Sequence, residues 1–331
     1  MDGRELADAL GGEHRRSLRP GEHHRRLPRR REVHLIPGLG KHRLERLQPE
    51  HLERLYVRMM RDGKSAATAH QAHQTALNEA VRRGHLSRNP ATLAKAPRLV
   101  DHEIEPFTVD EVQLLLKTAL ITRNGARWAV ALALGLRQGE ALGLKWSDVD
   151  LEAGTLVVRR ARLRPRWQYG CGGTCGRRYG GQCPQRVAEC TETAETKSRA
   201  GRRSVGLPDQ LVALLRQHRE AQDREREVAA QLWTDGDWLG ATPTGAPINS
   251  RTDYTEWKRL LAAAGVRDAR LHDARHTAAT VLLILGVPER AVMGIMGWSH
   301  SAMAARYQHV TAHIQQDIAG RVGGLIWSRA E

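Results

Sequence analysis

Apolar residues recur at helical spacing along most of this chain. Within residues 48–60, Leu52, Leu55 and Met59 fall on one face of a predicted helix, and a glycine follows shortly after its end. A second helix is predicted over residues 65–84, because a serine stands at its N-cap position and a glycine at its C-cap position.

The domain organisation follows from where this periodicity begins and ends. Residues 1–33 are rich in Arg, His, Gly and Pro without a sustained pattern, so we interpret them as a flexible basic arm or as leftover sequence. A small, basic, helical domain is expected at residues 34–97, since Asn89-Pro90 interrupts the pattern near its end. A linker at 98–107 then leads to a second domain at 108–331.

The second domain alternates helical patterns with two short apolar runs. The run WAVALALGL at residues 128–136 is apolar on every side, which predicts a central, buried helix. Thr108 and Glu111 form a capping box at the start of another helix. The remaining predicted elements are helices near 108–118, 208–231, 253–264, 272–286 and 288–296 and strands at 155–162 and 202–208. The expected fold class is therefore α+β, mainly α-helical with a small β-sheet.

Charge points to the class of partner. Lys plus Arg total 52 against 37 Asp plus Glu, which gives a formal net charge of +15. Such an excess favours a polyanionic partner, because neutralising phosphates releases condensed counterions, although basic proteins without nucleic-acid partners also exist. No apolar run approaches the roughly 18 residues that cross a bilayer, and no secretory signal opens the chain, so a cytoplasmic location is expected.

All four cysteines lie in one Gly-rich insertion between the two strands, at about residues 164–193. They are Cys171, Cys175, Cys183 and Cys190. Four thiols so close in sequence are typical of a structural tetrahedral zinc site, yet their spacing differs from paired C-x2-C knuckles. A loose insertion with free thiols remains the alternative.

Several residues suited to phosphate chemistry stand in a fixed order. They are Arg137 with Glu140, then Lys197, then His272-x-x-Arg275, and finally Trp298 followed nine positions later by Tyr307. Arginine donates several N–H groups in a fixed geometry, so Arg137 and Arg275 are suited to stabilising charge on a phosphodiester. The phenol of Tyr307 is suited to acting as a nucleophile.

In this order and with these flanks, the chain resembles the tyrosine recombinases, the phage integrase family, over about residues 34–318. The matching motifs are G-L-R-x-G-E-A-L-x-L, T-K-S, H-D-x-R-H-T, M-G-W-S and R-Y-x-H-V. The resemblance implies a helical, SAM-like core-binding domain and a mixed α/β catalytic domain that together clamp duplex DNA. It also implies strand exchange through a 3′-phosphotyrosyl link, with no cofactor required for catalysis.

The resemblance and the chemistry assign a role to each residue. Arg137 and Arg275 bind the phosphate, Trp298 donates its indole N–H to it, and Tyr307 attacks. His272 accepts the phenol proton, and Lys197 protonates the departing 5′ oxygen. Glu140, His276 and His300 are expected to support this set, with His300 as a competitor of Trp298 for its position.

The expected partner is double-stranded DNA at attachment sites. Candidate DNA-contacting residues are Arg58, Arg61, Arg82, Arg83, Arg88, Arg199, Arg202 and Arg203. The resemblance implies a homo-oligomer, a tetramer on DNA, assisted by proteins that set direction or bend DNA. The amphipathic segment at 312–327 either docks on a neighbouring copy or packs on its own domain.

The sequence departs from the family pattern in two places. The family's first core-binding helix should precede HLIPGLG, but that region lacks an apolar stripe, and the cysteine insertion exceeds a minimal hairpin. The favoured hypothesis is a site-specific integrase that acts in integration and excision of a phage or mobile element. The alternative is a catalytically inert, DNA-binding relic of such an element. A type IB topoisomerase fits less well, because a separate small N-terminal domain and a short hairpin argue against it.

Overall fold

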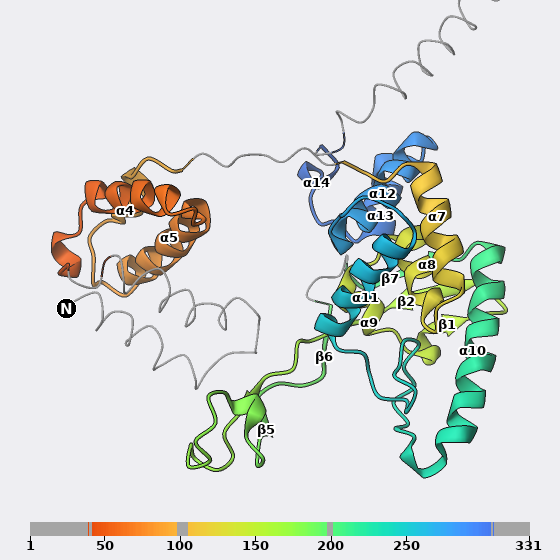
Figure 1. The fold of residues 1–331 in the computed structure, drawn as a ribbon. Coiled ribbons are helices and arrows are strands. Elements are labelled where there is room, and N and C mark those ends of the chain that lie inside the picture. Colours follow the sequence, from red (N-terminus) through yellow and green to blue (C-terminus); the bar gives the residue numbers. More distant parts are fainter. Residues whose placement is uncertain (1–38, 40–41, 98–104, 197–200, 306, 308–331) are drawn as a thin grey trace, which may run out of the picture. The chain divides into compact units, whose positions relative to one another are not determined.

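The chain divides into two compact units, Met1–His102 and Glu103–Glu331 (Figure 1). A computed structural model describes residues 39, 42–97, 105–196, 201–305 and 307. The predicted arm at 1–33 and most of the predicted linker lie outside these residues. The region before HLIPGLG, where the family's first helix was expected, lies outside them too. The predicted fold class, mainly helical with small sheets, is confirmed.

The first unit is helical throughout its described part. Its elements are η3 (Leu44–Arg46), α4 (Pro49–Arg61), α5 (Ala66–Arg82) and α6 (Pro90–Leu93). The apolar face of α4 packs on alanines of α5, whose small side chains allow a close approach of the two helices. Tyr56 of α4 is buried in this contact, and its hydroxyl lies 3.0 Å from Nδ1 of His73 on α5.

Capping residues fix where these helices begin. The Ser65 hydroxyl accepts a hydrogen bond from the Thr68 N–H, which confirms the predicted N-cap of α5. Asn89 caps α6 in the same way through the Ala91 N–H. The sequence pattern missed α6, because a single turn is too short to show helical periodicity, and α6 packs against both α4 and α5.

The second unit is built around α8. Its α-helices are α7 (Val109–Leu120), α8 (Gly125–Leu134), α9 (Gln138–Leu142), α10 (Asp209–Ala229), α11 (Ser250–Ala263), α12 (Leu271–Ile284), α13 (Glu289–Met296) and α14 (Ala302–Ala305). Helices α7, α10 and α12 all pack on α8, nearly every residue of which is buried, so the prediction of a central helix is confirmed. The short helices η4 (Trp146–Asp148), η5 (Gly180–Gln182) and η7 (Ala230–Leu232) connect longer elements.

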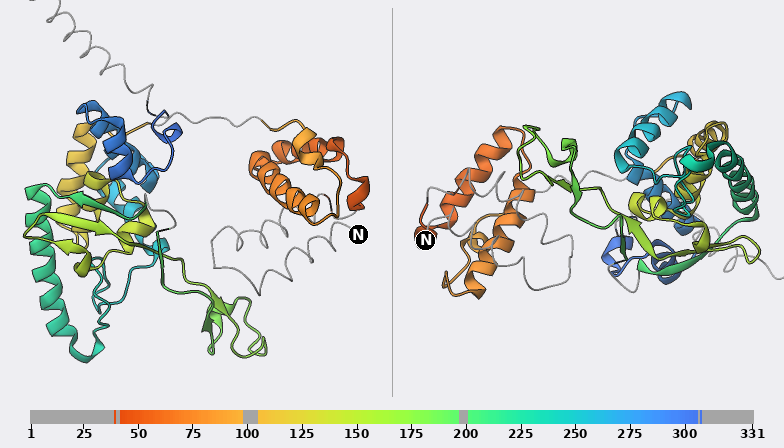
Figure 2. Two further views of the ribbon diagram at one scale, coloured as in Figure 1. Left: turned by 180° about the vertical axis from the view of Figure 1, so that it is seen from behind. Right: turned by 90° about the horizontal axis from the view of Figure 1, so that it is seen from below.

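Three small antiparallel sheets accompany these helices. The first has the order β1-β2-β7 and contains β1 (Val149–Asp150), β2 (Thr155–Val158) and β7 (Arg203–Gly206). The other two are the pairs β3 (Arg160–Arg162) with β6 (Thr193–Glu195) and β4 (Trp167–Gln168) with β5 (Val187–Ala188). The ladder of β3 and β6 carries the cysteine-rich insertion away from the helices of this unit (Figures 1 and 2). The predicted strand at 155–162 is thus divided between two sheets.

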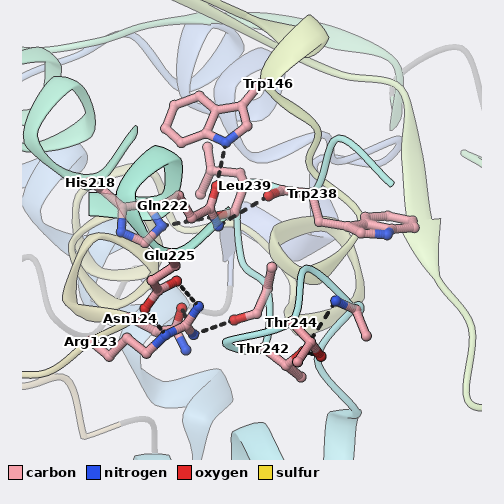
Figure 3. A network of polar contacts seen from close by, with 12 residues as sticks. Arg123, Asn124, Trp146, His218, Gln222, Glu225, Trp238, Leu239, Thr242 and Thr244 are labelled. Carbon is pink, nitrogen blue, oxygen red and sulfur yellow. Dashed lines mark hydrogen bonds and ion pairs between the residues drawn. The ribbon is translucent and has the colours of Figure 1, made fainter. Parts of the chain in front are cut away.

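A network of polar contacts joins α10 to the loop that follows η7 (Figure 3). Gln222 of α10 accepts a hydrogen bond from the Trp146 indole N–H at 2.7 Å and donates one to the Leu239 carbonyl at 3.0 Å. His218 lies 2.8 Å from the same carbonyl, and Arg123 binds Glu225. These contacts satisfy buried polar groups and anchor the long helix beside α8.

None of the helices in the described ranges combines the length and the apolar character needed to cross a bilayer.

Removing one partner of a buried ion pair should destabilise the second unit. Arg127 of α8 binds Asp253 of α11 through two hydrogen bonds of 2.6 and 2.9 Å, and both side chains are 1% exposed. Asp253→Ala leaves the guanidinium buried without its counter-ion, so we expect the free energy of unfolding to fall by about 3–5 kcal/mol in urea denaturation. The exposed pair of Arg259 and Glu256 provides the control, since Glu256→Ala should change stability by less than about 1 kcal/mol. Equal effects of the two variants would contradict this reading.

Candidate active site

The C-terminal turn of α13 binds three arginines through three consecutive carbonyls. The Ile295 carbonyl accepts a hydrogen bond from Nε of Arg203 at 2.6 Å. The Met296 carbonyl accepts one from Nη2 of Arg275 at 2.5 Å, and the Gly297 carbonyl one from Nη2 of Arg137 at 3.3 Å. The last carbonyls of a helix lack intrahelical partners and carry its negative dipole end, so they attract cations. Three segments remote in sequence thereby meet at one point.

Arg275 is held by the ends of two helices. Its side chain is buried, and besides the Met296 carbonyl it binds the Gly135 carbonyl through Nη1 at 2.7 Å. Gly135 terminates α8 with φ +60°, and a Cβ there would lie 2.8 Å from Met296 Cε and 2.9 Å from Ala278 Cβ. Only glycine fits this junction without displacing its neighbours. Burial and the nearby charge of Arg137 lower the pKa of Arg275 to about 9, so the guanidinium stays charged at neutral pH.

Glu140 links the other two arginines. Its carboxylate accepts hydrogen bonds from Nη1 of Arg137 at 2.6 Å and from Nη2 of Arg203 at 2.9 Å. It also accepts the Arg137 N–H at 3.1 Å, which closes a capping box at the start of α9. Burial acts to raise the Glu140 pKa, but the hydrogen bonds and charges of Arg203 and Arg137 outweigh it and hold that pKa below its ordinary value. The Arg137 side chain remains 42% exposed and available to a phosphate.

Arg203 is a correction to the sequence-based prediction, which placed it among the DNA-contacting residues. Its side chain is 6% exposed and is fully engaged with the Ile295 and Gly201 carbonyls and with Glu140. A guanidinium in this position cannot reach a DNA backbone. The alternation along β7 indicates this burial, because Arg203 and Val205 share the inward face of the strand while Ser204 points outward.

Two histidines on α12 pack edge to face, with ring centroids 4.8 Å apart. His272 reaches the surface, but partial desolvation and the charges of Arg275 and Arg137 lower its pKa. His276 is buried, and burial, with a further contribution from His272, lowers its pKa to about 4. Both rings are therefore neutral at pH 7 and able to accept a proton or a hydrogen bond.

Tyr307 lies in the same unit, but its hydroxyl is withdrawn from solvent. The side chain is 2% exposed, its ring stacks on Trp298 at 5.4 Å, and its oxygen is 2.5 Å from Nδ1 of His276. The sequence predicted His272 as the partner of this hydroxyl, whereas the structure places His276 there. His272 and His276 are four residues apart, about one helical turn, so both project from the same face of α12 and the sequence could not decide between them.

Trp298 follows the left-handed Gly297 (φ +63°) that ends α13, and its ring is buried beside Tyr307. Its indole N–H finds no hydrogen-bond acceptor among the described residues. Buried N–H groups without an acceptor are uncommon, so this donor is suited to a phosphate oxygen at the site. His300, the rival for this position, is exposed on the turn before α14.

The remaining candidates divide by location. Lys197 and Arg199 lie outside the described residues. Arg58, Arg61, Arg88 and Arg202 are exposed, as is Arg82, which together with the half-buried Arg83 binds Glu79. The segment at 312–327 is also outside the described residues.

The cysteine-rich insertion brings three of its four thiols together. Sulfur atoms of Cys171, Cys175 and Cys183 all lie within 4.8 Å of one another. Cys190 is outside this group, with its sulfur 3.7 Å from the Arg164 carbonyl. The predicted four-cysteine cluster is therefore a cluster of three.

Comparison with known proteins decides the family. The model of the phage integrase family matches residues 105–313. An integrase of Saccharopolyspora erythraea is 46% identical over 329 residues, covering 89% of this chain and 75% of that protein. This chain belongs to the phage integrase family. A XerC-like tyrosine recombinase of Caldanaerobacter subterraneus is 29% identical, and the match covers 78% of this chain and 66% of that protein.

Solved integrase structures share the fold. The Tn1549 transposon integrase in complex with a circular intermediate DNA superposes with a TM-score of 0.69 at 19% identity, covering 93% of this chain and 94% of that one. A lambda integrase dimer bound to a core site gives a TM-score of 0.62 at 17% identity, with 93% and 95% covered. These structures show the fold. The family model and the relatives make the chain a tyrosine recombinase, a family of DNA recombinases that act by transesterification.

The buried position of Arg203 can be tested against its exposed neighbour. Arg203→Met removes one partner of the buried Glu140, so we expect the free energy of unfolding to fall on the order of 3 kcal/mol. Arg202→Met should leave stability within about 0.5 kcal/mol of the native value. Urea denaturation measures both. A variant at Arg203 with native stability and weakened binding to a generic DNA duplex would restore the original assignment.

Proposed function

We propose that this integrase cuts and rejoins duplex DNA at specific sites, with Tyr307 as the nucleophile, during integration and excision of a mobile element. The observation that carries the proposal is the convergence of Arg137 and Arg275 on the C-terminal turn of α13, beside Trp298 and Tyr307. Two fixed guanidinium groups and an indole N–H supply donors for the charge that builds on a phosphate under attack.

The transfer proceeds in two steps, each of which forms one ester bond to phosphorus and breaks another. The Tyr307 oxygen attacks phosphorus and the bond to the 5′ oxygen breaks, which leaves a 3′-phosphotyrosyl link and a free 5′ hydroxyl. A 5′ hydroxyl of the partner strand then attacks the link and releases the tyrosine. One phosphodiester is exchanged for another through an ester of similar energy, so the steps need neither ATP nor a cofactor. His272 accepts the phenol proton, and Lys197 donates a proton to the departing oxygen.

Tyr307 has to leave its buried position before it reaches DNA. In the described state its hydroxyl is hydrogen-bonded to the neutral His276 and its ring stacks on Trp298. Rotation away from this contact frees the hydroxyl for attack and exposes the Trp298 N–H to a phosphate. His272 is exposed on α12, the helix that also carries the buried His276, and is therefore the neutral ring that bound DNA can approach.

DNA is the proposed partner, and four copies the proposed assembly on paired sites. The high positive charge and the exposed arginines of α4 and of the region after α5 favour contacts with the phosphate backbone. Lambda integrase, which shares the fold with a TM-score of 0.61 at 17% identity, has been solved as a tetramer bound to a Holliday junction. Proteins that bend DNA or set the direction of exchange are further proposed partners.

We also propose a structural zinc ion in the cysteine-rich insertion. It takes no part in the transfer steps.

Covalent capture tests the enzyme against the inert relic. A nicked suicide duplex carrying the attachment sequence, taken from DNA that flanks the gene, should yield a protein–DNA adduct that survives denaturing electrophoresis. Tyr307→Phe should abolish the adduct, whereas Tyr254→Phe, at an exposed tyrosine of α11, should retain it. Native protein that shifts the duplex in a binding assay without forming an adduct would support the relic.

The pH dependence of cleavage tests the role of His272. The pKa of this ring is lowered below 6.5, so its proton-accepting form predominates above that pH and is lost as pH falls through the lowered pKa. We expect single-turnover cleavage to show an acid limb with a midpoint below pH 6.5. His272→Gln should remove this limb and slow cleavage, and His300→Gln should leave the profile unchanged. An acid limb that persists in His272→Gln would assign the titration to another group.

A further inference from the structure

The cysteine-rich insertion has almost no hydrophobic core. Among residues 164–193, all of which the structure describes, only Cys183 is buried. Its secondary structure consists of the two-residue pair β4–β5 and the single turn η5. A segment of this size cannot stabilise itself by apolar burial and ordinarily depends on disulfides or a metal.

Three of the four thiols of the insertion lie close together. The Cys171 and Cys183 sulfurs are 3.4 Å apart, and that of Cys175 completes a group within 4.8 Å. All three cysteines are free thiols, and a disulfide would require sulfurs about 2.0 Å apart. Zinc–sulfur bonds of about 2.3 Å in tetrahedral geometry place sulfurs roughly 3.8 Å apart, which is the scale of this cluster.

Backbone N–H groups lie close to two of the thiols. Those of Gly173 and Cys175 hydrogen-bond to the Cys171 sulfur, and that of Arg177 hydrogen-bonds to the Cys175 sulfur. Tyr169 lies beside the cluster, but its hydroxyl donates to the Arg177 carbonyl at 2.8 Å.

Cys190 lies apart from this arrangement. It follows β5, and its sulfur is placed 3.7 Å from the Arg164 carbonyl, outside the group of three. The insertion thus contains its own matched control, a fourth cysteine in the same segment that the geometry does not assign to the site.

We propose that Cys171, Cys175 and Cys183 bind one zinc ion as thiolates and that the ion takes the place of a hydrophobic core in the insertion. Thiolate ligands select zinc over magnesium or calcium, and three of them leave one coordination position for a ligand other than Cys190. The inference refines the zinc ion suggested under the proposed function, and it is independent of DNA cleavage because the metal is bound without DNA.

The ion also explains how exposed cationic and aromatic residues of the insertion keep their positions. The Arg186 guanidinium lies 4.5 Å from the ring centre of Trp167, and that of Arg178 lies 5.3 Å from Tyr179. These pairs are at the surface, where each contributes little by itself. Bound metal fixes the backbone that presents them.

Metal content of the full-length protein, purified under reducing conditions, tests the site. We expect about one zinc per chain and, after exchange with Co²⁺, the intense near-ultraviolet absorption of thiolate–cobalt bonds. Cys171→Ser, Cys175→Ser and Cys183→Ser should each weaken Zn²⁺ binding more than about tenfold, while Cys190→Ser should match the native protein. Less than about half an equivalent of zinc overturns the proposal, and so does loss of zinc in Cys190→Ser.

Two further measurements separate loss of metal from general misfolding. A thiol-specific reagent should modify one cysteine rapidly in the zinc-bound protein and four after chelation. Chelation should also speed tryptic cleavage after Arg177, Arg178 and Arg186 several-fold without changing the thermal unfolding of the helical core. Four reactive thiols before chelation, or cleavage rates that chelation leaves unchanged, contradict the proposal whatever the suicide-substrate assay shows.

Discussion

The active site depends on one constraint, the need of three buried or half-buried arginines for acceptors at the C-terminal turn of α13. Carbonyls of Ile295, Met296 and Gly297 each accept from a different arginine. These arginines come from the loop after α8, from β7 and from α12. The end of α13 therefore holds three parts of the second unit together and also shapes the candidate site. Carbonyl dipoles have no net charge, and the cluster therefore keeps its positive charge for a phosphate.

Charge within this cluster is balanced incompletely. Glu140 neutralises part of the field of Arg137 and Arg203, but the hydrogen-bond acceptors of Arg275 are uncharged carbonyls. Burial and the charge of Arg137 lower the Arg275 pKa to about 9. A site that repels its own charges is less stable than an apolar core would be. Its two guanidinium groups are also already oriented by their carbonyl partners, which favours binding of an anion.

Tyr307 and the cysteine-rich insertion show two other ways in which the fold accommodates polar groups. Tyr307 is stored against a neutral His276, which satisfies its hydroxyl in a site with little access to water. Three thiols gather in a segment that lacks apolar side chains to bury. Each arrangement follows from the cost of leaving a polar group unpaired or a segment without a core.

The sequence by itself determined most of the longer helices, the fold class, the family and the order of the candidate site residues, because periodicity, caps and motif spacing are local properties. It placed α8 at the centre from its uniformly apolar composition. Tertiary structure alone decided that Arg203 binds Glu140, that His276 and not His272 meets Tyr307, and that Cys190 stands apart from the other thiols. Those outcomes depend on which faces of remote elements pack together, and no local pattern encodes that geometry.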